Sequence, residues 1–192
     1  MACNKKVTDD LLFDCADAPK KGIDGGKGVL INWDDIDRSG STFSGATITD
    51  LVLKSGATGF SVQWYKDLAS ANSAFTPNTE DVDGFTHNFL TRLANSSAAN
   101  AERANELKNG RFVMVYETRY KGVNNAEAFK VAGWENGLKL SEMTNNTLEN
   151  SGATLFTLAT EEGDVERYPY SVFLENDYAT SKATYDALFA TV

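Results

Sequence analysis

The sequence contains few of the residues and segments on which several protein classes depend. Its 192 residues include one histidine, two cysteines, three prolines and 15 glycines. With so few histidines and cysteines, the chain cannot build a four-ligand Cys/His zinc site. The low proline and glycine content also excludes the collagen-like and proline-rich classes. No run approaches the roughly 20 apolar residues of a membrane span, so we expect no membrane-spanning segment.

Basic residues are scarce as well. The chain has 27 acidic and 18 basic residues, which gives a formal net charge of −9. Proteins that grip nucleic acid usually carry a clustered basic surface, so this composition argues against such a role. The first 15 residues lack the apolar core of a secretory signal. We therefore expect a protein made in a reducing cytoplasm, with Cys3 and Cys15 as free thiols.

The hydrophobic pattern divides the chain into an arm and one domain. Residues 1–28 are polar and their last third is rich in glycine, which predicts an arm or extension without regular structure. From residue 29 to residue 192, short runs alternate between apolar and polar positions, the period expected of strands. A hairpin turn is expected at residues 55–59. The predicted strands are residues 29–33, 47–53, 59–65, 83–94, 111–120, 128–134, 153–160 and 170–174.

Two segments have the helical period instead. Residues 97–108 contain strong helix formers, with Ser96 or Ser97 as the N-cap and Gly110 placed as a C-cap glycine. The apolar stripe of this helix is Ala101, Ala104 and Leu107. A short helix is expected near residues 180–190, with Tyr185, Leu188 and Phe189 on one side. The predicted fold class is a β-rich α+β protein: an antiparallel β-sandwich or half-barrel with one central flanking helix and a short C-terminal helix.

The stretch NWDDIDRSGSTF, residues 32–43, resembles the start of a calcium-binding EF-hand loop. Asp35, Asp37, Ser39 and Gly40 match the first alternating oxygen ligands and the glycine of such a loop. The twelfth position should then be a bidentate glutamate, but it is Ala46. Because the flanking segments also read as strands, we interpret the stretch as an acidic turn and expect no metal site.

No pattern of catalytic residues stands out. The only histidine, His87, belongs to the alternating face of residues 83–94 with Phe85 and Phe89, so we expect a half-buried strand residue rather than a base. Nucleophile, phosphate-loop and dinucleotide motifs are absent. The carboxylates of residues 160–166 fit a solvated turn better than a glycosidase pair. We therefore expect no catalytic or cofactor-binding residues, no cofactor and no enzyme.

The three tryptophans allow a second interpretation. Exposed tryptophans on a β-sandwich can stack on sugar rings, which would make the chain a sugar-binding module. Trp33, Trp64 and Trp134 each lie in an apolar strand run, however. This position favours tryptophans that anchor the core or an interface.

A longer pattern resembles a known group of proteins. The stretch LKNGRFVMVYETRYKGVNNAEAFKVAGWENGLKLSEMT, residues 107–144, has a helix ending in N-G-R, a long strand, a K-G turn, another strand and G-L-x-x-S-E-M. With the closing ENDYATSKATYDAL, residues 175–188, it resembles the tail tube proteins of tailed-phage virions. The resemblance covers residues 25–190 and is closest from residue 83 onward.

The resemblance implies a function in assembly. Proteins of this group form a β-sandwich that oligomerises, usually as a hexameric ring, and the rings stack into a tube through which DNA passes without specific binding. It implies contacts with other phage tail or head–tail proteins, no membrane contact, and a place in the virion tail after assembly in the bacterial host cytoplasm. An acidic lumen, or one without a basic stripe, would suit such a tube. A ring or connector protein of a short tail or head–tail junction is the alternative.

Overall fold

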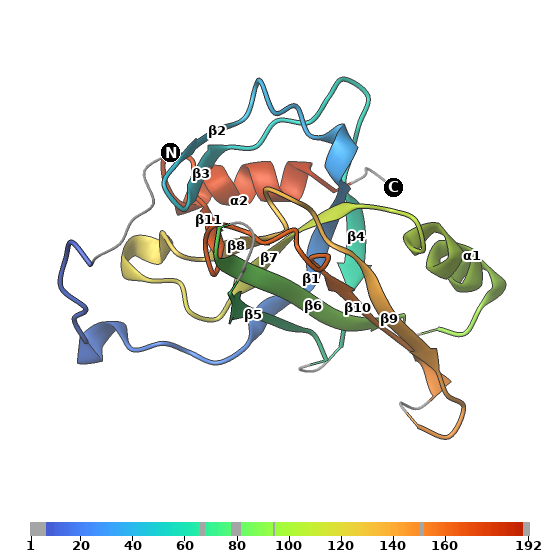
Figure 1. Ribbon diagram of the computed structural model, residues 1–192. Helices are drawn as coiled ribbons and strands as arrows, with labels where there is room; N and C mark the ends of the chain where they lie inside the picture. Colours follow the sequence, from blue (N-terminus) through green and yellow to red (C-terminus); the bar gives the residue numbers. More distant parts are fainter. Residues whose placement is uncertain (1–6, 66–67, 78–81, 94, 150–151, 190–192) are drawn as a thin grey trace.

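The chain folds into three stacked layers. The computed structural model describes residues 7–65, 68–77, 82–93, 95–149 and 152–189. Helix α2 (Tyr178–Ala187) covers one face of a seven-stranded sheet, and a four-stranded sheet covers the other face (Figure 1). The predicted class, a strand-rich α+β protein with two helices, is confirmed, and the described strands form no closed barrel.

The seven-stranded sheet carries the most buried strands. Its order is β2-β3-β11-β8-β7-β1-β4, antiparallel except for the β3–β11 pair. The central strands β7 and β8 are apolar along most of their length, and both are buried on both faces. The strand bounds are β1 Ile23–Asn32, β2 Thr42–Ser44, β3 Thr47–Asp50, β4 Phe60–Gln63, β7 Phe112–Thr118, β8 Phe129–Ala132 and β11 Ser171–Phe173.

The four-stranded sheet is fully antiparallel and has the order β5-β6-β10-β9. Its bounds are β5 Ser70–Thr76, β6 Gly84–Leu93, β9 Lys139–Asn145 and β10 Thr154–Ala159. Strand β6 shows the predicted alternation: His87, Phe89 and Thr91 are buried, while the residues between them lie on the other face. Because the side-chain period of a strand is two, one face of this sheet packs inward and the other is left outside.

Two apolar clusters hold the layers together. Between α2 and the seven-stranded sheet, the Tyr185 ring lies 4.9 Å from the Phe129 ring and the two side chains are fully buried. Between the sheets, the Phe89 ring lies 5.9 Å from Trp64 and 5.5 Å from Tyr116. The prediction that Tyr185, Leu188 and Phe189 lie on one side is confirmed: all three belong to the cluster between α2 and the seven-stranded sheet, Phe189 as a partly buried member. Since each buried aromatic ring removes a large apolar area from water, these clusters supply most of the packing between layers.

Helix α1 (Ala98–Leu107) forms where it is predicted, but most of it lies in solvent. The Ser97 hydroxyl accepts a hydrogen bond from the Asn100 backbone N–H at 3.2 Å, the predicted N-cap. The predicted apolar stripe is wrong at Ala101, which is exposed, and only Leu107 is buried. Gly110 is not the C-cap either: the cap is Lys108, and a Cβ at Gly110 would lie 1.9 Å from the Phe112 ring.

Several predicted boundaries are corrected by strand pairing. Strand β1 begins at Ile23, so residues 23–28 belong to the sheet although glycines interrupt them; a register shift between Ile23 and Gly28 accommodates Gly25 and Gly26. Residues 55–59 do not join a hairpin, because β3 pairs with β2 and β11 while β4 pairs with β1. Strands β2, β5 and β9 were not predicted: they lie at sheet edges and expose mostly polar side chains.

We expect Leu107→Ala to lower the free energy of unfolding by roughly 2–4 kcal/mol, the range for truncation of a buried leucine. Leu107 is 8% exposed and packs in the cluster between the sheets. Leu148→Ala is the matched control, since Leu148 is 91% exposed and should cost less than about 0.5 kcal/mol. Urea denaturation of both variants measures the difference. Equal costs would mean that Leu107 does not pack as described.

Candidate assembly surface

The outer face of the four-stranded sheet is uncovered and mostly uncharged. Neither described helix lies on it, and the inward face is the one that packs on the seven-stranded sheet. Cross-strand pairs such as Asn72 with Asn88, and Leu90 with Thr157, share this outer face. Its side chains are those of Ser70, Asn72, Ala74, Thr76, Thr86, Asn88, Leu90, Arg92, Lys139, Glu142, Thr144, Leu155, Thr157 and Ala159. The face therefore offers hydroxyl and amide groups rather than a charged surface.

The charges on this face are few and most have partners. Arg92 Nη1 donates to the Tyr65 hydroxyl at 3.3 Å, and its guanidinium lies over the Tyr65 ring. Lys139 Nζ lies 2.5 Å from Glu161 Oε2. Glu142 is the remaining charged residue of the four strands. The negative net charge of the chain therefore comes from residues outside these four strands. The face itself is nearly neutral and has no continuous basic stripe.

The two edges of this sheet, β5 and β9, are complementary to each other. Neither edge pairs with another strand of the described residues on its outer side. With four alternating strands, β5 and β9 run in opposite directions, and each has seven residues. Unpaired edges of this length readily pair with another chain. The β9 edge of one copy can therefore continue the antiparallel sheet of a second copy at β5.

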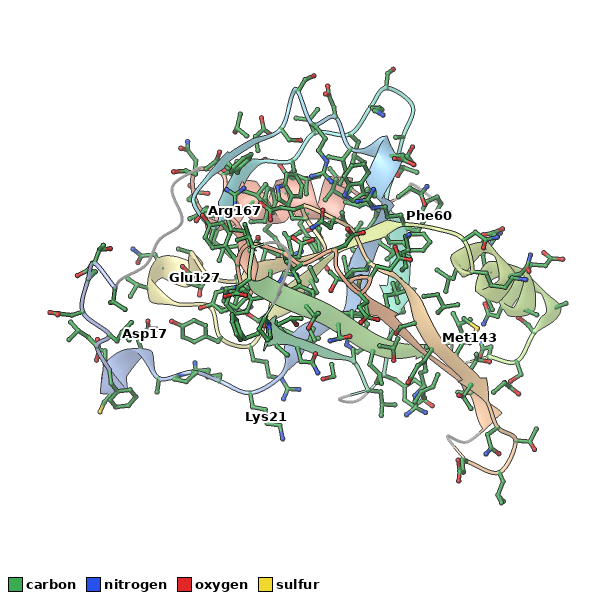
Figure 2. The ribbon with its side chains drawn as sticks, viewed as in Figure 1. Asp17, Lys21, Phe60, Glu127, Met143 and Arg167 are labelled. Carbon is green, nitrogen blue, oxygen red and sulfur yellow. The ribbon has the colours of Figure 1, made fainter. Side chains whose placement is uncertain are left out.

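An apolar segment projects from the body before β1. Leu11, Leu12 and Phe13 are 91%, 87% and 74% exposed. The chain is fixed to the body after them, because the Tyr120 hydroxyl donates to Asp17 Oδ2 at 2.8 Å and this bond raises the pKa of Tyr120. Figure 2 marks the course of the segment by Asp17 and Lys21. Cys15, in the short 3-10 helix Cys15–Asp17, is an exposed free thiol, while Cys3 lies outside the described residues.

The EF-hand-like stretch is a turn stabilised by its own carboxylate. Asp37 Oδ1 accepts hydrogen bonds from the Ser39 hydroxyl at 2.6 Å, the Ser39 N–H at 2.9 Å and the Gly40 N–H at 3.1 Å. These bonds lower the pKa of Asp37. Asp35 is also occupied, since its Oδ2 accepts from the Asn32 amide at 2.8 Å. Among the residues that the structure describes, no group of three or more His, Cys, Asp or Glu side chains is placed to hold a metal ion.

The tryptophans are packing anchors rather than a platform for sugar rings. Trp64 and Trp134 are buried, and Trp33 is partly buried. The guanidinium carbon of Arg38 lies 4.6 Å from the centre of the Trp33 ring and 4.3 Å from that of Trp134. The guanidinium carbon of Arg111 lies 3.8 Å from the centre of the Trp33 ring. With two of the rings buried and arginine stacked on Trp33 and Trp134, none of the three offers an exposed aromatic platform.

The chain crosses from one sheet to the other at residues 133–138, and Glu166 holds this corner. Its Oε2 accepts from the Glu135 N–H at 2.9 Å, and its Oε1 accepts from the Asn136 N–H at 2.8 Å. Burial raises the pKa of Glu166, and the two backbone N–H groups oppose part of the rise. The Trp33 indole N–H and Arg111 Nε donate to the carbonyls of the same two corner residues. Almost every polar backbone group of the corner thus has a partner.

His87 is fully buried and belongs to the same corner, whereas we expected it to be half-buried. Its Nδ1 accepts from the Gly133 N–H at 3.2 Å, so the proton is on Nε2, which donates to the Tyr168 carbonyl at 2.8 Å. Both ring nitrogens are therefore used in joining β6 to the corner. This arrangement leaves no nitrogen to act as a base.

The cavity at this corner is too small for an active site. Glu166, Glu135, Trp134 and Tyr168 line a cavity of about 10 Å³. This is the space of about one water molecule, so a sugar ring cannot enter between the two carboxylates. The remaining acidic residues of 160–166, Glu161, Glu162 and Asp164, are exposed as expected of a turn, and Glu166 is the member that sequence reasoning missed.

We expect the melting temperature to be the same within error in saturating calcium and in chelator. The Asp37 carboxylate already accepts three hydrogen bonds within its turn, so a calcium ion would have to displace them. Differential scanning calorimetry of the full chain provides the measurement. A rise of several degrees in calcium would mean that the folded state binds the ion.

Glu166→Ala should lower the free energy of unfolding by roughly 2–4 kcal/mol, because two buried backbone N–H groups lose their acceptor. Glu162→Ala is the control, an exposed glutamate of the same segment. The folded chain binds more protons than the unfolded chain between the ordinary glutamate pKa of about 4.3 and the raised pKa of Glu166. The contribution of Glu166 to stability should therefore fall through this window as the pH rises, and the cost of Glu166→Ala should be greater at its acidic end. Equal effects of the two variants would contradict this role.

Comparisons of the chain with known proteins found no match. No protein-family model, no curated protein and no solved structure matches it. No helix in the described part of the chain has the length and hydropathy needed to cross a bilayer. The features that point to a function are therefore the uncovered sheet face, its two open edges and the projecting apolar segment.

Proposed function

We propose that this chain is the tail tube protomer of a tailed phage, a structural virion protein rather than an enzyme. In this proposal six copies form a ring, rings stack with each other and with other tail or head–tail proteins, and DNA passes through the lumen. One observation carries the proposal: β5 and β9 are open, equal in length and opposite in direction. The resemblance of residues 107–144 to tail tube proteins supports the same assignment.

The strand arrangement is suited to ring closure. When β9 of each copy pairs with β5 of the next, the sheets join without a change in strand polarity, and closure of the ring leaves no open edge on these sheets. Six four-stranded sheets would give 24 strands. At about 4.8 Å per strand, such a ring measures about 37 Å across between backbones, and more when the strands tilt. A duplex fits through an opening of this width.

The outer sheet face suits a surface along which DNA slides. In the proposed ring this face lines the lumen, because the other face packs on the seven-stranded sheet. Its two cations are Arg92, stacked on Tyr65, and Lys139, paired with Glu161. Binding to phosphates depends on cations that can release counterions, so a nearly neutral wall of amides and hydroxyls gives DNA little to bind. The lumen would then be passive without being strongly acidic.

The competing functions receive less support from the geometry. A sugar-binding module needs an exposed aromatic platform, and the three tryptophans are buried or stacked by arginine. A ring or connector protein of a short tail or head–tail junction would share the open edges, so it remains the nearest alternative within virion proteins. The two differ in whether rings stack on themselves.

We expect negative-stain images of the concentrated purified protein to contain rings or stacked tubes. When β5 pairs with β9 of the next copy, an incomplete ring keeps a free β5 edge at one end and a free β9 edge at the other, so assembly should proceed to closure. Rings without stacks would favour the connector, whereas a protein that remains monomeric at hundreds of micromolar would contradict self-assembly through these edges.

We also expect the wild-type protein not to retard duplex DNA at low salt, and Glu142→Lys/Thr157→Lys to retard it. The two positions are cross-strand partners on the outer sheet face, so the variant creates a basic patch there in every copy. Glu102→Lys/Asn105→Lys on α1 is the control, since it makes the same charge change at two exposed helix positions. Gel retardation across a salt series measures the effect. Tight, salt-sensitive binding by the wild-type protein would be incompatible with a passive lumen.

A further inference from the structure

An open groove lies between the two sheets beside strand β5. Its volume is about 130 Å³, close to the roughly 150 Å³ of a cavity that admits a benzene ring. Its walls come from both sheets and from the segment before β11, and Asn72, Ser73 and His87 add polar groups to an otherwise apolar lining. The other lining residues are Ala71, Tyr116, Val131, Ala132, Pro169 and Tyr170. A groove of this size has room for one aromatic side chain, and its polar groups can pair with the backbone on either side of that side chain.

The groove is also lined by a tyrosine whose hydroxyl is open to solvent. Tyr116 is 7% exposed, and no hydrogen bond joins its hydroxyl to any residue that the structure describes. Burial raises the pKa of this phenol, so it remains protonated and is a donor. Water reaches this oxygen, and an acceptor that enters with an occupant of the groove can replace that water. A peptide carbonyl is such an acceptor.

The segment before β1 has the properties of this occupant. Leu11, Leu12 and Phe13 form a consecutive apolar run that is almost entirely in solvent, between Asp9, Asp10 and Asp14. Exposed apolar surface of this kind typically marks an interaction site. On the groove side, the Lys130 ammonium lies 4.6 Å from the Tyr170 ring. Lys130 also pairs with Glu127, and its ammonium is a cation beside the groove that can attract the acidic flanks of the segment.

We propose that Phe13 of one copy occupies the groove of a second copy, with a backbone carbonyl of the segment accepting a hydrogen bond from the Tyr116 hydroxyl. The segment is fixed to its own body at Asp17 and projects away from both sheets (Figure 1). Its eight residues 7–14 reach at most roughly 26 Å, which suits contact between neighbouring copies. The inference rests on the groove and the segment, and it holds whether or not the copies form a tube.

Photo-cross-linking tests which chain supplies the segment. A photoreactive phenylalanine analogue at position 13 is introduced into the full chain, and ¹⁴N- and ¹⁵N-labelled protein are mixed before irradiation. We expect mixed-isotope cross-links that map to β5, to β8 or to residues 168–170. Cross-links only within one isotope would show that the segment folds onto its own body. Cross-links elsewhere, or none, would also overturn the proposal.

Peptide titration tests the groove itself. A fluorescein-labelled peptide of residues 7–14 is titrated with the full chain carrying Phe13→Ala, whose own segment competes weakly. We expect saturable binding, a roughly 3- to 10-fold weaker affinity when Tyr116→Phe is added, and no binding by the peptide with Phe13→Ala. The added control Tyr65→Phe removes a hydroxyl outside the groove and should leave the affinity unchanged. Failure of the peptide to bind, or equal affinity with and without the Tyr116 hydroxyl, would overturn the proposal. If rings still form in stained images, such a result would not affect the proposed function, because ring formation depends on β5 and β9.

Discussion

The burial of strands β7 and β8 on both faces is the constraint on which the rest of the structure depends. A sheet with two apolar faces needs a cover on each side. Helix α2 supplies one cover through Tyr185, and the four-stranded sheet supplies the other through Phe89. The apolar face of the four-stranded sheet is buried in this contact. Its second face is polar, and its edge strands β5 and β9 have no partner strand on their outer side among the described residues. The surface available for assembly is therefore a direct consequence of how the core is closed.

The two sheets stay in register because one buried polar corner connects them. Glu166 and His87 come from the segments around β10 and β6, and both accept backbone hydrogen bonds from residues 133–136. Polar groups in such a place need complete pairing, and the corner largely provides it. The Arg38 and Arg111 guanidinium groups pack on Trp33 beside it, and Arg38 thereby links the corner to the EF-hand-like turn. The carboxylates that first suggest calcium or catalysis therefore hold the fold.

The sequence predicts this fold where the side chains themselves face the core. The alternation around Phe89, the apolar run of β7 and the N-cap at Ser97 are local signals, and each identified its element. Strands β5 and β9 give no such signal, because their stability comes from backbone pairing to β6 and β10 rather than from buried side chains. Glu166 was missed for a related reason: its partners are backbone groups about 30 residues away, and an acidic residue in an acidic turn looks solvated.

The central claim is that β5 and β9 are the edges through which copies associate. Hydrogen–deuterium exchange of the assembled and monomeric protein, compared segment by segment, tests it most directly, because edge amides exchange freely until they pair. The account predicts that residues 70–76 and 139–145 gain protection together on assembly, while β6 and β10, already paired on both sides, change little. Unchanged exchange in β5 and β9, with new protection confined to other segments of an assembled particle, would contradict it.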